Sequence, residues 1–165
     1  MVLFALSVTV LLNSSCHITL NGASTVGLKS INVEYFENNA PIVVNYLSQQ
    51  FTEALKTRIR STTNLTIIQG DATAHMSGSI TGYTIEPISV QATSNNAPPI
   101  AGGERLTITV NVIYVNTADK KLSFTQSFSE HQDFTGDIAS QEQNLVTAIN
   151  KQLTDDIFNK AFANW

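Results

Sequence analysis

The stretch "RLTITVNVIYVN", from Arg105 to Asn116, decides the fold, because apolar and polar residues alternate along it almost without interruption. Alternation with a period of two is typical of a β-strand that has one buried face. The face opposite to Thr107 and Thr109 is entirely apolar and consists of Leu106, Ile108, Val110, Val112 and Tyr114. We therefore predict a strand here, with this apolar face on the core.

A second alternating run follows closely. The segment "LSFTQSFSEH", from Leu122 to His131, places Leu122, Phe124 and Phe128 on one side. The polar segment "TADKK", from Thr117 to Lys121, separates the two runs. Two alternating runs joined by a short polar turn predict a β-hairpin.

Three upstream segments also have the character of strands: "LKSINVEYF" (28–36), "NLTIIQ" (64–69) and "AHMSGSITGYTIEPISVQA" (74–92). In the first, Ile31, Val33 and Tyr35 share a face. The glycines and Pro87 of the third predict bends or a bulge and favour an edge strand. The Pro-, Gly- and Asn-rich segment from Thr93 to Glu104 predicts a mobile loop.

Two segments have helical periodicity. Residues 42–61 carry one apolar stripe, formed by Val44, Leu47, Phe51, Leu55 and Ile59, and residues 140–165 carry another, formed by Leu145, Ile149, Leu153, Ile157, Ala161 and Trp165. Asn38 and Pro41 predict the start of the first helix. Ser140 and Gln143 match a capping box at the start of the second.

These elements follow the order strand, helix, four strands, helix. Each helix has one apolar stripe, and each main strand has one apolar face. A sheet with both helices on one side buries all of these surfaces together. We predict an α+β fold, a two-layer sandwich in which two helices pack on one face of a mostly antiparallel sheet of four to five strands.

The composition excludes several classes of function. Charged residues make up 13 % of the chain, against about 25 % in an average globular protein. The net charge of −4 argues against a nucleic-acid-binding protein, which would present a basic patch. His17, His75 and His131 have no metal-ligand spacing, and the consecutive Asp155 and Asp156 point in different directions on a helix. The sequence therefore predicts no metal site, no cofactor and no enzyme.

The first fifteen residues, "MVLFALSVTVLLNSS", are uncharged. Their apolar core of about eleven residues suits a signal peptide better than a transmembrane helix, which needs roughly 20. Small residues precede Cys16, the only cysteine, as in the lipobox of bacterial lipoproteins, although Asn13 replaces the usual apolar residue. We expect residues 1–15 to be a lipoprotein signal peptide, Cys16 to be lipidated and residues 16–165 to form one domain. The alternative is a buried strand with a free core cysteine.

Three basic residues are candidate ligand-binding residues: Lys120 and Lys121 in the hairpin turn, and Arg60 at the end of the first helix. They could contact the phosphates of an anionic lipid. Alternatively, the two lysines form only a solvated loop tip, and Arg60 only complements the helix dipole.

Several motifs occur together in a recognisable order. They are "YFENNAP" followed by "LSQQFTEAL" (47–55), "NLT" at Asn64, "GSITGY" at Gly78, "RLTITVNV" at Arg105, "FTQSFS" at Phe124 and "DIFNKAFANW" at Asp156. Together they resemble a divergent branch of the LptE family of lipopolysaccharide-assembly lipoproteins. The likeness extends from about Val33 to Trp165.

The resemblance implies a non-catalytic outer-membrane lipoprotein that faces the periplasm. Family members plug and assemble the LptD-type β-barrel of the lipopolysaccharide translocon, and some bind lipopolysaccharide. The family's lipidated cysteine corresponds to Cys16, whereas its lipopolysaccharide-contacting residues match no motif of this chain. The alternative function is a free-standing periplasmic lipoprotein that binds a lipid or small ligand between helices and sheet.

Overall fold

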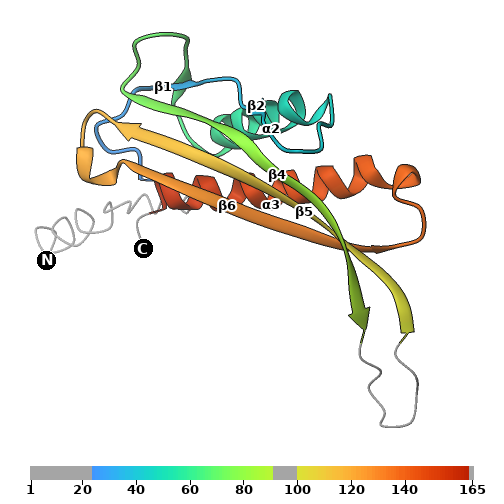
Figure 1. Cartoon of the computed structure of the whole chain (residues 1–165). Helices are drawn as coiled ribbons and strands as arrows, with labels where there is room; N and C mark the ends of the chain where they lie inside the picture. The colour runs from blue at the N-terminus through green and yellow to red at the C-terminus, as the bar shows by residue number, and fades with distance from the viewer. Residues whose placement is uncertain (1–23, 91–99, 164–165) are drawn as a thin grey trace, which may run out of the picture.

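Helices cover one face of a curved sheet in the computed structural model, which describes residues 24–90 and 100–163 (Figure 1). Two helices occur in this part of the chain, α2 (Leu47–Thr62) and α3 (Glu142–Phe162). The strands are β1 (Ser30–Val33), β2 (Glu37–Asn38), β3 (Thr66–Ile67), β4 (Ala74–Val90), β5 (Ile100–Asn116) and β6 (Phe124–Thr135). Two short 3-10 turns, η1 (Lys120–Leu122) and η2 (Ile138–Ser140), flank β6. The predicted α+β fold is confirmed.

The sheet is mixed, which corrects the expectation of a mostly antiparallel sheet of four to five strands. It has six strands in the order β3-β1-β4-β5-β6, and β2 also pairs with β4. The pairs β4–β5 and β5–β6 are antiparallel, whereas β1 pairs in parallel with both β3 and β4. A crossover helix is the usual connection between parallel neighbours, and α2 connects β1 and β2 to β3 in this way. Periodicity predicts the faces of a strand but not its direction.

The predicted apolar face of the central strand β5 packs against the core. Its five inward side chains, Leu106, Ile108, Val110, Val112 and Tyr114, are all at most 1 % exposed. The β5–β6 hairpin is also present. However, Leu122 lies exposed in η1 instead of sharing the buried face with Phe128, because the 3-10 turn interrupts the strand. Tyr35 is likewise exposed, because β1 ends at Val33.

Strand β4 is an edge strand over only half its length. Its first half lies between β5 and the short strands β1 and β2, whereas no β1 or β2 pairing extends beyond Ile80 in the described chain. Pro87 lies in this second half, where β4 pairs with β5 alone among the described residues, and proline is tolerated on such an edge. The predicted irregularity is present as register shifts between Ile80 and Gly82 and between Ile88 and Ser89.

The predicted loop from Thr93 to Glu104 is partly wrong. Residues 91–99 lie outside the described residues, but Ile100 onward belongs to β5 and pairs with the end of β4. Gly103 permits this pairing, since a Cβ there would lie 2.8 Å from Cγ1 of Ile88. Gly103 therefore serves close strand packing within β5.

Both helices begin later than their sequence signals suggest. Asn38 caps a turn instead of a helix, because its Oδ1 accepts a hydrogen bond from the N–H of Ala40 at 3.1 Å. Helix α2 then starts at Leu47, and its four core residues Leu47, Phe51, Leu55 and Ile59 are fully buried. The predicted capping box is absent, since the hydroxyl of Ser140 donates to the carbonyl of Asp137 at 2.8 Å.

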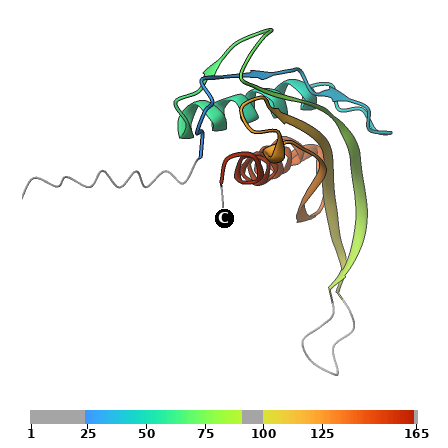
Figure 2. The same cartoon turned by 90° about the vertical axis from the view of Figure 1, so that its left-hand side faces the viewer.

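Helix α3 buries a wider stripe than predicted. Ile149, Leu153, Ile157 and Ala161 are buried as expected, and Val146, Phe158 and Phe162 are buried as well. The extra width follows from packing against both the sheet and α2. Trp165 lies outside the described residues. Seen along α3, the sheet curves around the helices, so its uncovered face is convex (Figure 2).

Candidate functional site

The turn between β5 and β6 presents its two lysines on a well-ordered framework. The side chain of Asn116 is buried, and its Oδ1 accepts hydrogen bonds from the N–H groups of Ala118 and Asp119 at 3.0 and 2.8 Å. The carboxylate of Asp119 accepts from the N–H of Lys121 at 3.0 Å. These bonds fix the backbone of η1, while the side chains of Lys120 and Lys121 remain exposed to solvent.

A groove of about 510 Å³ lies between this turn and the end of α3. Its lining consists of Lys121, Leu122, Ser123 and Phe124 on one side and Asn159, Lys160 and Ala163 on the other. The ammonium of Lys160 lies 5.9 Å from the ring centre of Phe124. Two cations beside an aromatic and an aliphatic side chain suit a ligand that has both an anionic group and an apolar part.

The structure supports part of the predicted set of basic residues. Lys121 lines the groove, and Lys120 is its neighbour in η1. Arg60 lies exposed in the last turn of α2 and does not line the groove. The sequence did not predict Lys160 as a site residue. The packing of α3 against the hairpin places it opposite Lys121, and no local sequence pattern predicts that arrangement.

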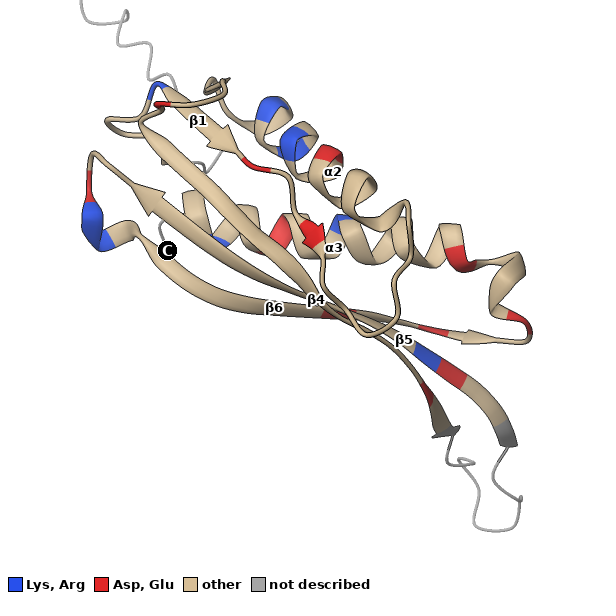
Figure 3. Ribbon diagram, turned by 45° about the horizontal axis from the view of Figure 1, so that its top comes forward, with Lys and Arg blue, Asp and Glu red and all other residues tan. Residues whose placement is uncertain are grey.

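Positive charge nevertheless gathers at one end of the molecule. The η1 turn and the last turns of α2 carry Lys and Arg at the same end (Figure 3). Glu86, Glu104, Asp133 and Asp137 lie towards the other end of the long strands. The molecule is therefore polarised along the strand direction, with the groove at the basic end.

The described chain also begins at the basic end. The N–H of Ser24 donates to the carbonyl of Phe162 at 2.5 Å. A Cβ on Gly27 would lie 3.1 Å from the Cβ of Ala118, and the N–H of Lys29 donates to Thr73 at 2.9 Å. Cys16 lies outside the described residues, eight positions before Ser24.

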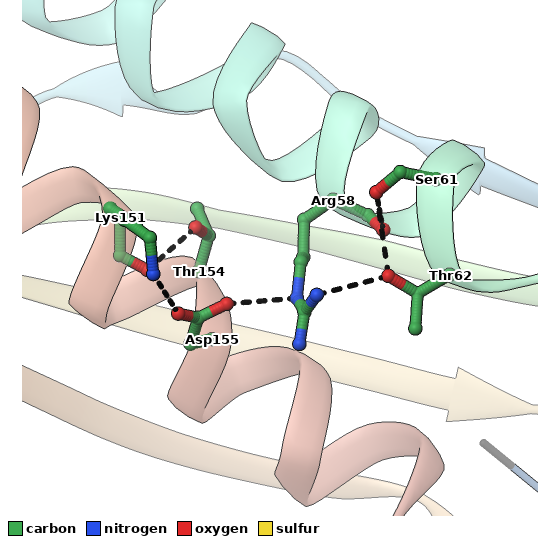
Figure 4. Close-up of polar contacts among 6 residues, drawn as sticks. All are labelled: Arg58, Ser61, Thr62, Lys151, Thr154 and Asp155. Atoms are coloured by element: carbon green, nitrogen blue, oxygen red, sulfur yellow. Dashed lines mark hydrogen bonds and ion pairs between the residues drawn. The ribbon is translucent and has the colours of Figure 1, made fainter. Parts of the chain in front are cut away.

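A second groove, of about 370 Å³, separates α2 from α3 on the side away from the sheet. Arg58 spans it, with Nε 2.8 Å from Oδ1 of Asp155 (Figure 4). Asp155 also pairs with Lys151 at 2.8 Å, and the guanidinium of Arg58 lies 4.6 Å from the ring centre of Phe158. Arg58 of α2 and Lys151 of α3 share the one carboxylate of Asp155, so we interpret this cluster as a connection between the helices and not as a ligand site.

Two further carboxylates of α3, Glu142 and Asp156, lie close to titratable side chains of the sheet. Glu142 accepts a hydrogen bond from the hydroxyl of Tyr83 at 2.6 Å, and burial together with this bond raises the pKa of Tyr83. Partial burial and the neighbouring Asp156 raise the pKa of Glu130. Asp155 faces α2 whereas Asp156 lies beside β6, which confirms that consecutive helix residues diverge.

Among the residues that the structure describes, no group of three or more His, Cys, Asp or Glu side chains could hold a metal ion. In that same part of the chain, neither helix combines the length and the apolar character of a transmembrane span.

Comparisons with known proteins identify the fold and the family. The architecture is similar to that of the minor lipoprotein of Acinetobacter baumannii, with a TM-score of 0.50, 11 % identity and coverage of 81 % of this chain and 91 % of that chain. It is also similar to the rare lipoprotein B of Shewanella oneidensis, with a TM-score of 0.51, 12 % identity and coverage of 79 % and 92 %. These likenesses concern the fold alone.

No curated protein sequence matches this chain significantly. The family model described as LptE, lipopolysaccharide-assembly, however, matches residues 28–161, which include every strand described above, helix α2 and all but the last residue of helix α3. The chain therefore belongs to the LptE family of lipopolysaccharide-assembly proteins.

Proposed function

We propose that this chain is a non-catalytic, lipid-anchored subunit of the machinery that assembles lipopolysaccharide in the outer membrane. It is attached through Cys16 on the periplasmic side and associates with an LptD-type β-barrel. The observation that carries this proposal is the family match over residues 28–161. The basic end, where the described chain begins eight residues after Cys16, supports it.

The groove at the basic end has the chemistry to bind a phosphorylated, acylated lipid. Lys121, Lys160, Leu122 and Phe124 line the groove. In this proposal the two lysines bind phosphate groups, and the two apolar side chains bind an acyl chain. Lys120 and Arg60 add attraction at longer range. Lipopolysaccharide combines phosphates with acyl chains, so it is the ligand that this proposal assigns to the groove.

The alternative function, a free-standing carrier with its ligand between the layers, has less support. The inward residues of β5 and of both helices belong to one continuous buried core, with Ile108, Val110, Ile149 and Leu153 completely buried. A carrier would need a concave apolar site in this position. The groove lies instead at the rim, between η1 and the end of α3.

The anchor is tested by the intact mass of the protein after detergent extraction from its native membrane. We expect a chain that begins at Cys16 and carries acyl groups, and we expect Cys16→Ala to lose them. An unmodified chain that still contains residues 1–15 would contradict the anchor.

The partner is tested by gentle extraction and identification of co-purifying proteins by mass spectrometry. We expect an LptD-type β-barrel in stoichiometric amounts. Recovery of the lipoprotein alone, at protein concentrations that preserve other membrane complexes, would contradict the proposed assembly role.

The groove is tested by the binding of lipopolysaccharide to purified Lys121→Gln and Lys160→Gln variants. Each loss of a charge-assisted contact should weaken binding about tenfold. Lys151→Gln is the matched control, since Lys151 is exposed on the same helix as Lys160 but pairs with Asp155 away from the groove. Equal affinities of all three variants would remove the groove from the proposal.

A further inference from the structure

A third concavity lies where α2 and α3 begin, at the end of the helices away from η1 (Figure 1). Its volume is about 360 Å³, which is at the lower end of the range of small-molecule sites. Among the described residues, its lining consists of Tyr46, Gln49, Gln50 and Glu53 on the α2 side and Gln143 on the α3 side. We call this concavity the glutamine pocket.

The glutamine pocket lies between two helices that are tied together. The Nε2 of Gln50 donates to Oγ1 of Thr147 at 2.8 Å, which joins α2 to α3 beside the pocket. The hydroxyl of Thr147 in turn donates to the carbonyl of Gln143 at 2.7 Å. About two turns further along, the ion pair between Arg58 and Asp155 joins the same helices. These contacts fix the spacing of the helices, so the pocket is formed before any ligand binds.

One acceptor of this network has no partner. Because the hydroxyl of Thr147 donates to Gln143, its oxygen accepts from Gln50, and this sets which end of the Gln50 amide faces Thr147. The Oε1 of Gln50 is buried and has no hydrogen-bond partner among the described residues. The side chains of Gln49 and Gln143 are exposed, so a ligand can displace them to reach this oxygen. A ligand group that donates to Oε1 supplies a hydrogen bond that the protein alone lacks.

The charges around the pocket favour an uncharged ligand. Among the described residues its lining contains no Lys, Arg or His, and the carboxylate of Glu53 pairs with the ammonium of Lys56 at 3.0 Å. An anion would meet the carboxylate of Glu53, and a cation would meet the ammonium of Lys56. An apolar ligand would leave the glutamine amides without partners. A ligand rich in hydroxyl groups fits, because each amide has donors and an acceptor and each hydroxyl can both donate and accept.

Tyr46 adds an aromatic surface to the pocket. Its side chain is 36 % exposed. Burial and the neighbouring Glu142 raise the pKa of Tyr46, so the phenol stays protonated and keeps a hydrogen-bond donor. The C–H groups of a sugar ring pack on an aromatic face while the ring hydroxyls contact nearby polar groups. Amides beside one aromatic ring are therefore the side chains that recognise a saccharide.

We propose that the glutamine pocket binds an uncharged saccharide, with one sugar ring against Tyr46 and a hydroxyl that donates to Oε1 of Gln50. The amides of Gln49 and Gln143 bind further hydroxyls. The inference goes beyond the proposed function and does not rest on it, because the pocket and the basic groove lie at opposite ends of the helices. The saccharide part of a glycolipid and a free oligosaccharide share this chemistry.

Binding is tested by NMR titration of the full-length protein in a detergent without a sugar head group. The probes are trisaccharides of glucose, galactose, mannose and N-acetylglucosamine, and inorganic phosphate. We expect at least one trisaccharide, at millimolar concentration, to shift the side-chain amide signals of Gln49, Gln50 and Gln143. The amide of Gln152, which accepts from Gln132 at 3.0 Å away from the pocket, should not shift. The proposal is overturned if no trisaccharide shifts the pocket signals, if Gln152 shifts equally, or if phosphate has the same effect.

Variants then locate the two principal contacts. Gln50→Leu removes the orphan acceptor, and Tyr46→Ala removes the aromatic surface. We expect each to weaken binding of the trisaccharide about tenfold. Tyr46→Phe keeps the ring, and Gln152→Leu removes the same amide elsewhere on α3, so both should bind within about twofold of the wild type. Thermal unfolding establishes that the variants fold. Wild-type affinity in both Gln50→Leu and Tyr46→Ala would overturn the proposal.

A further titration distinguishes the two sources of the saccharide and the two ends of the molecule. The saccharide chain released from lipopolysaccharide by mild acid is compared with the trisaccharides. Tighter binding of the released chain, lost in Gln50→Leu, would assign the pocket to a glycolipid, and tighter binding of a trisaccharide would assign it to a free oligosaccharide. Lys121→Gln should change neither affinity. An equal loss in Lys121→Gln would place the saccharide in the basic groove and overturn the inference, while the proposed function would stand.

Discussion

At the scale of single residues, the buried polar side chains of the core differ in whether they have a hydrogen-bond partner. Thr52 is buried in α2, and its hydroxyl accepts a hydrogen bond from the N–H of Phe36 at 3.1 Å. Asn150 of α3 is 1 % exposed, and neither atom of its amide has a hydrogen-bond partner among the described residues. A buried polar group without a partner costs about 1–3 kcal/mol. Asn150 therefore destabilises the fold, whereas Thr52 supports it.

The substitution Asn150→Leu should stabilise the protein. Leucine has a similar length, and it removes the cost of burying an unpaired amide, so we expect the free energy of unfolding to rise by about 1–3 kcal/mol. Urea unfolding measures this change. Asn144→Leu, at an exposed position of the same helix, is the control and should change stability by no more than about 0.5 kcal/mol. A destabilised Asn150→Leu variant would mean that the amide has a partner in solution.

Two buried tyrosines predict how stability depends on alkaline pH. Burial raises the pKa of Tyr114 to about 12. Burial and the hydrogen bond to Glu142 also raise the pKa of Tyr83. Tyrosines of the unfolded chain lose their protons near pH 10, so above that pH the unfolded state binds fewer protons than the folded state. Stability should be fully present below about pH 10 and should fall as the pH rises towards 12.

Urea unfolding between pH 8 and pH 11.5 measures this dependence. Tyr114→Phe should flatten the alkaline decline, because it removes one of the two groups that lose protons only on unfolding. Comparing each variant with itself at pH 8 separates this effect from any change in packing. An unchanged alkaline slope in Tyr114→Phe would contradict the assignment.

At the scale of elements, the periodicity of the sequence predicts which face of a helix or strand is buried better than it predicts which elements lie next to each other. The alternation in β5 and the stripe of α3 predict which side chains are buried, because these periods are local properties of a strand and a helix. The parallel pairing of β1 and the change of β4 from an interior to an edge strand depend on contacts across more than forty residues, such as Asn32 with His75. No local pattern encodes them.

Gly78 illustrates such a long-range constraint within β4. A Cβ at this position would lie 2.0 Å from the carbonyl oxygen of Asn111 and 2.8 Å from Cε1 of Phe36. Gly78 has a φ of +155°, and Gly102 has a similar φ of +151° but no atom near its missing Cβ among the described residues. The two glycines therefore differ in packing and share their backbone strain.

The substitution Gly78→Ala should destabilise the protein more than Gly102→Ala by about 1–3 kcal/mol, the usual cost of overpacking. Thermal or urea unfolding of both variants measures the difference. Because the strain from φ is shared, the difference reports the steric contact alone. Equal losses of stability would show that the strands move apart without cost at Gly78.

At the scale of the whole molecule, the candidate site is only partly visible in the sequence. The sequence predicts that Lys120 and Lys121 are exposed cations, because a short polar segment between two alternating runs forms a turn of well-defined geometry. Lys160 and the groove require α3 to reach the same end as η1.

The polarity of the molecule predicts its orientation at a membrane. The eight residue steps from Cys16 to Ser24 span at most about 28 Å, and Ser24 contacts Phe162 at the basic end. The 12 residues of β6 extend about 40 Å from that end. If Cys16 is acylated, the basic end is held within about 28 Å of the lipid surface. We therefore predict that the basic end faces the lipid and that the acidic end points away from it.

Fluorescence quenching in vesicles measures this orientation. The lipidated protein, with Cys16 blocked by its acyl groups, is labelled at Lys120→Cys or at Thr135→Cys and reconstituted with nitroxide-labelled lipids. We expect stronger quenching at position 120 than at position 135, because position 120 lies in η1, just before β6 begins, and position 135 is the last residue of β6. Anionic lipids should enlarge the difference and high salt should reduce it, since the lysines attract the surface electrostatically. Stronger quenching at position 135 would place the acidic end at the membrane and contradict the attachment through Cys16.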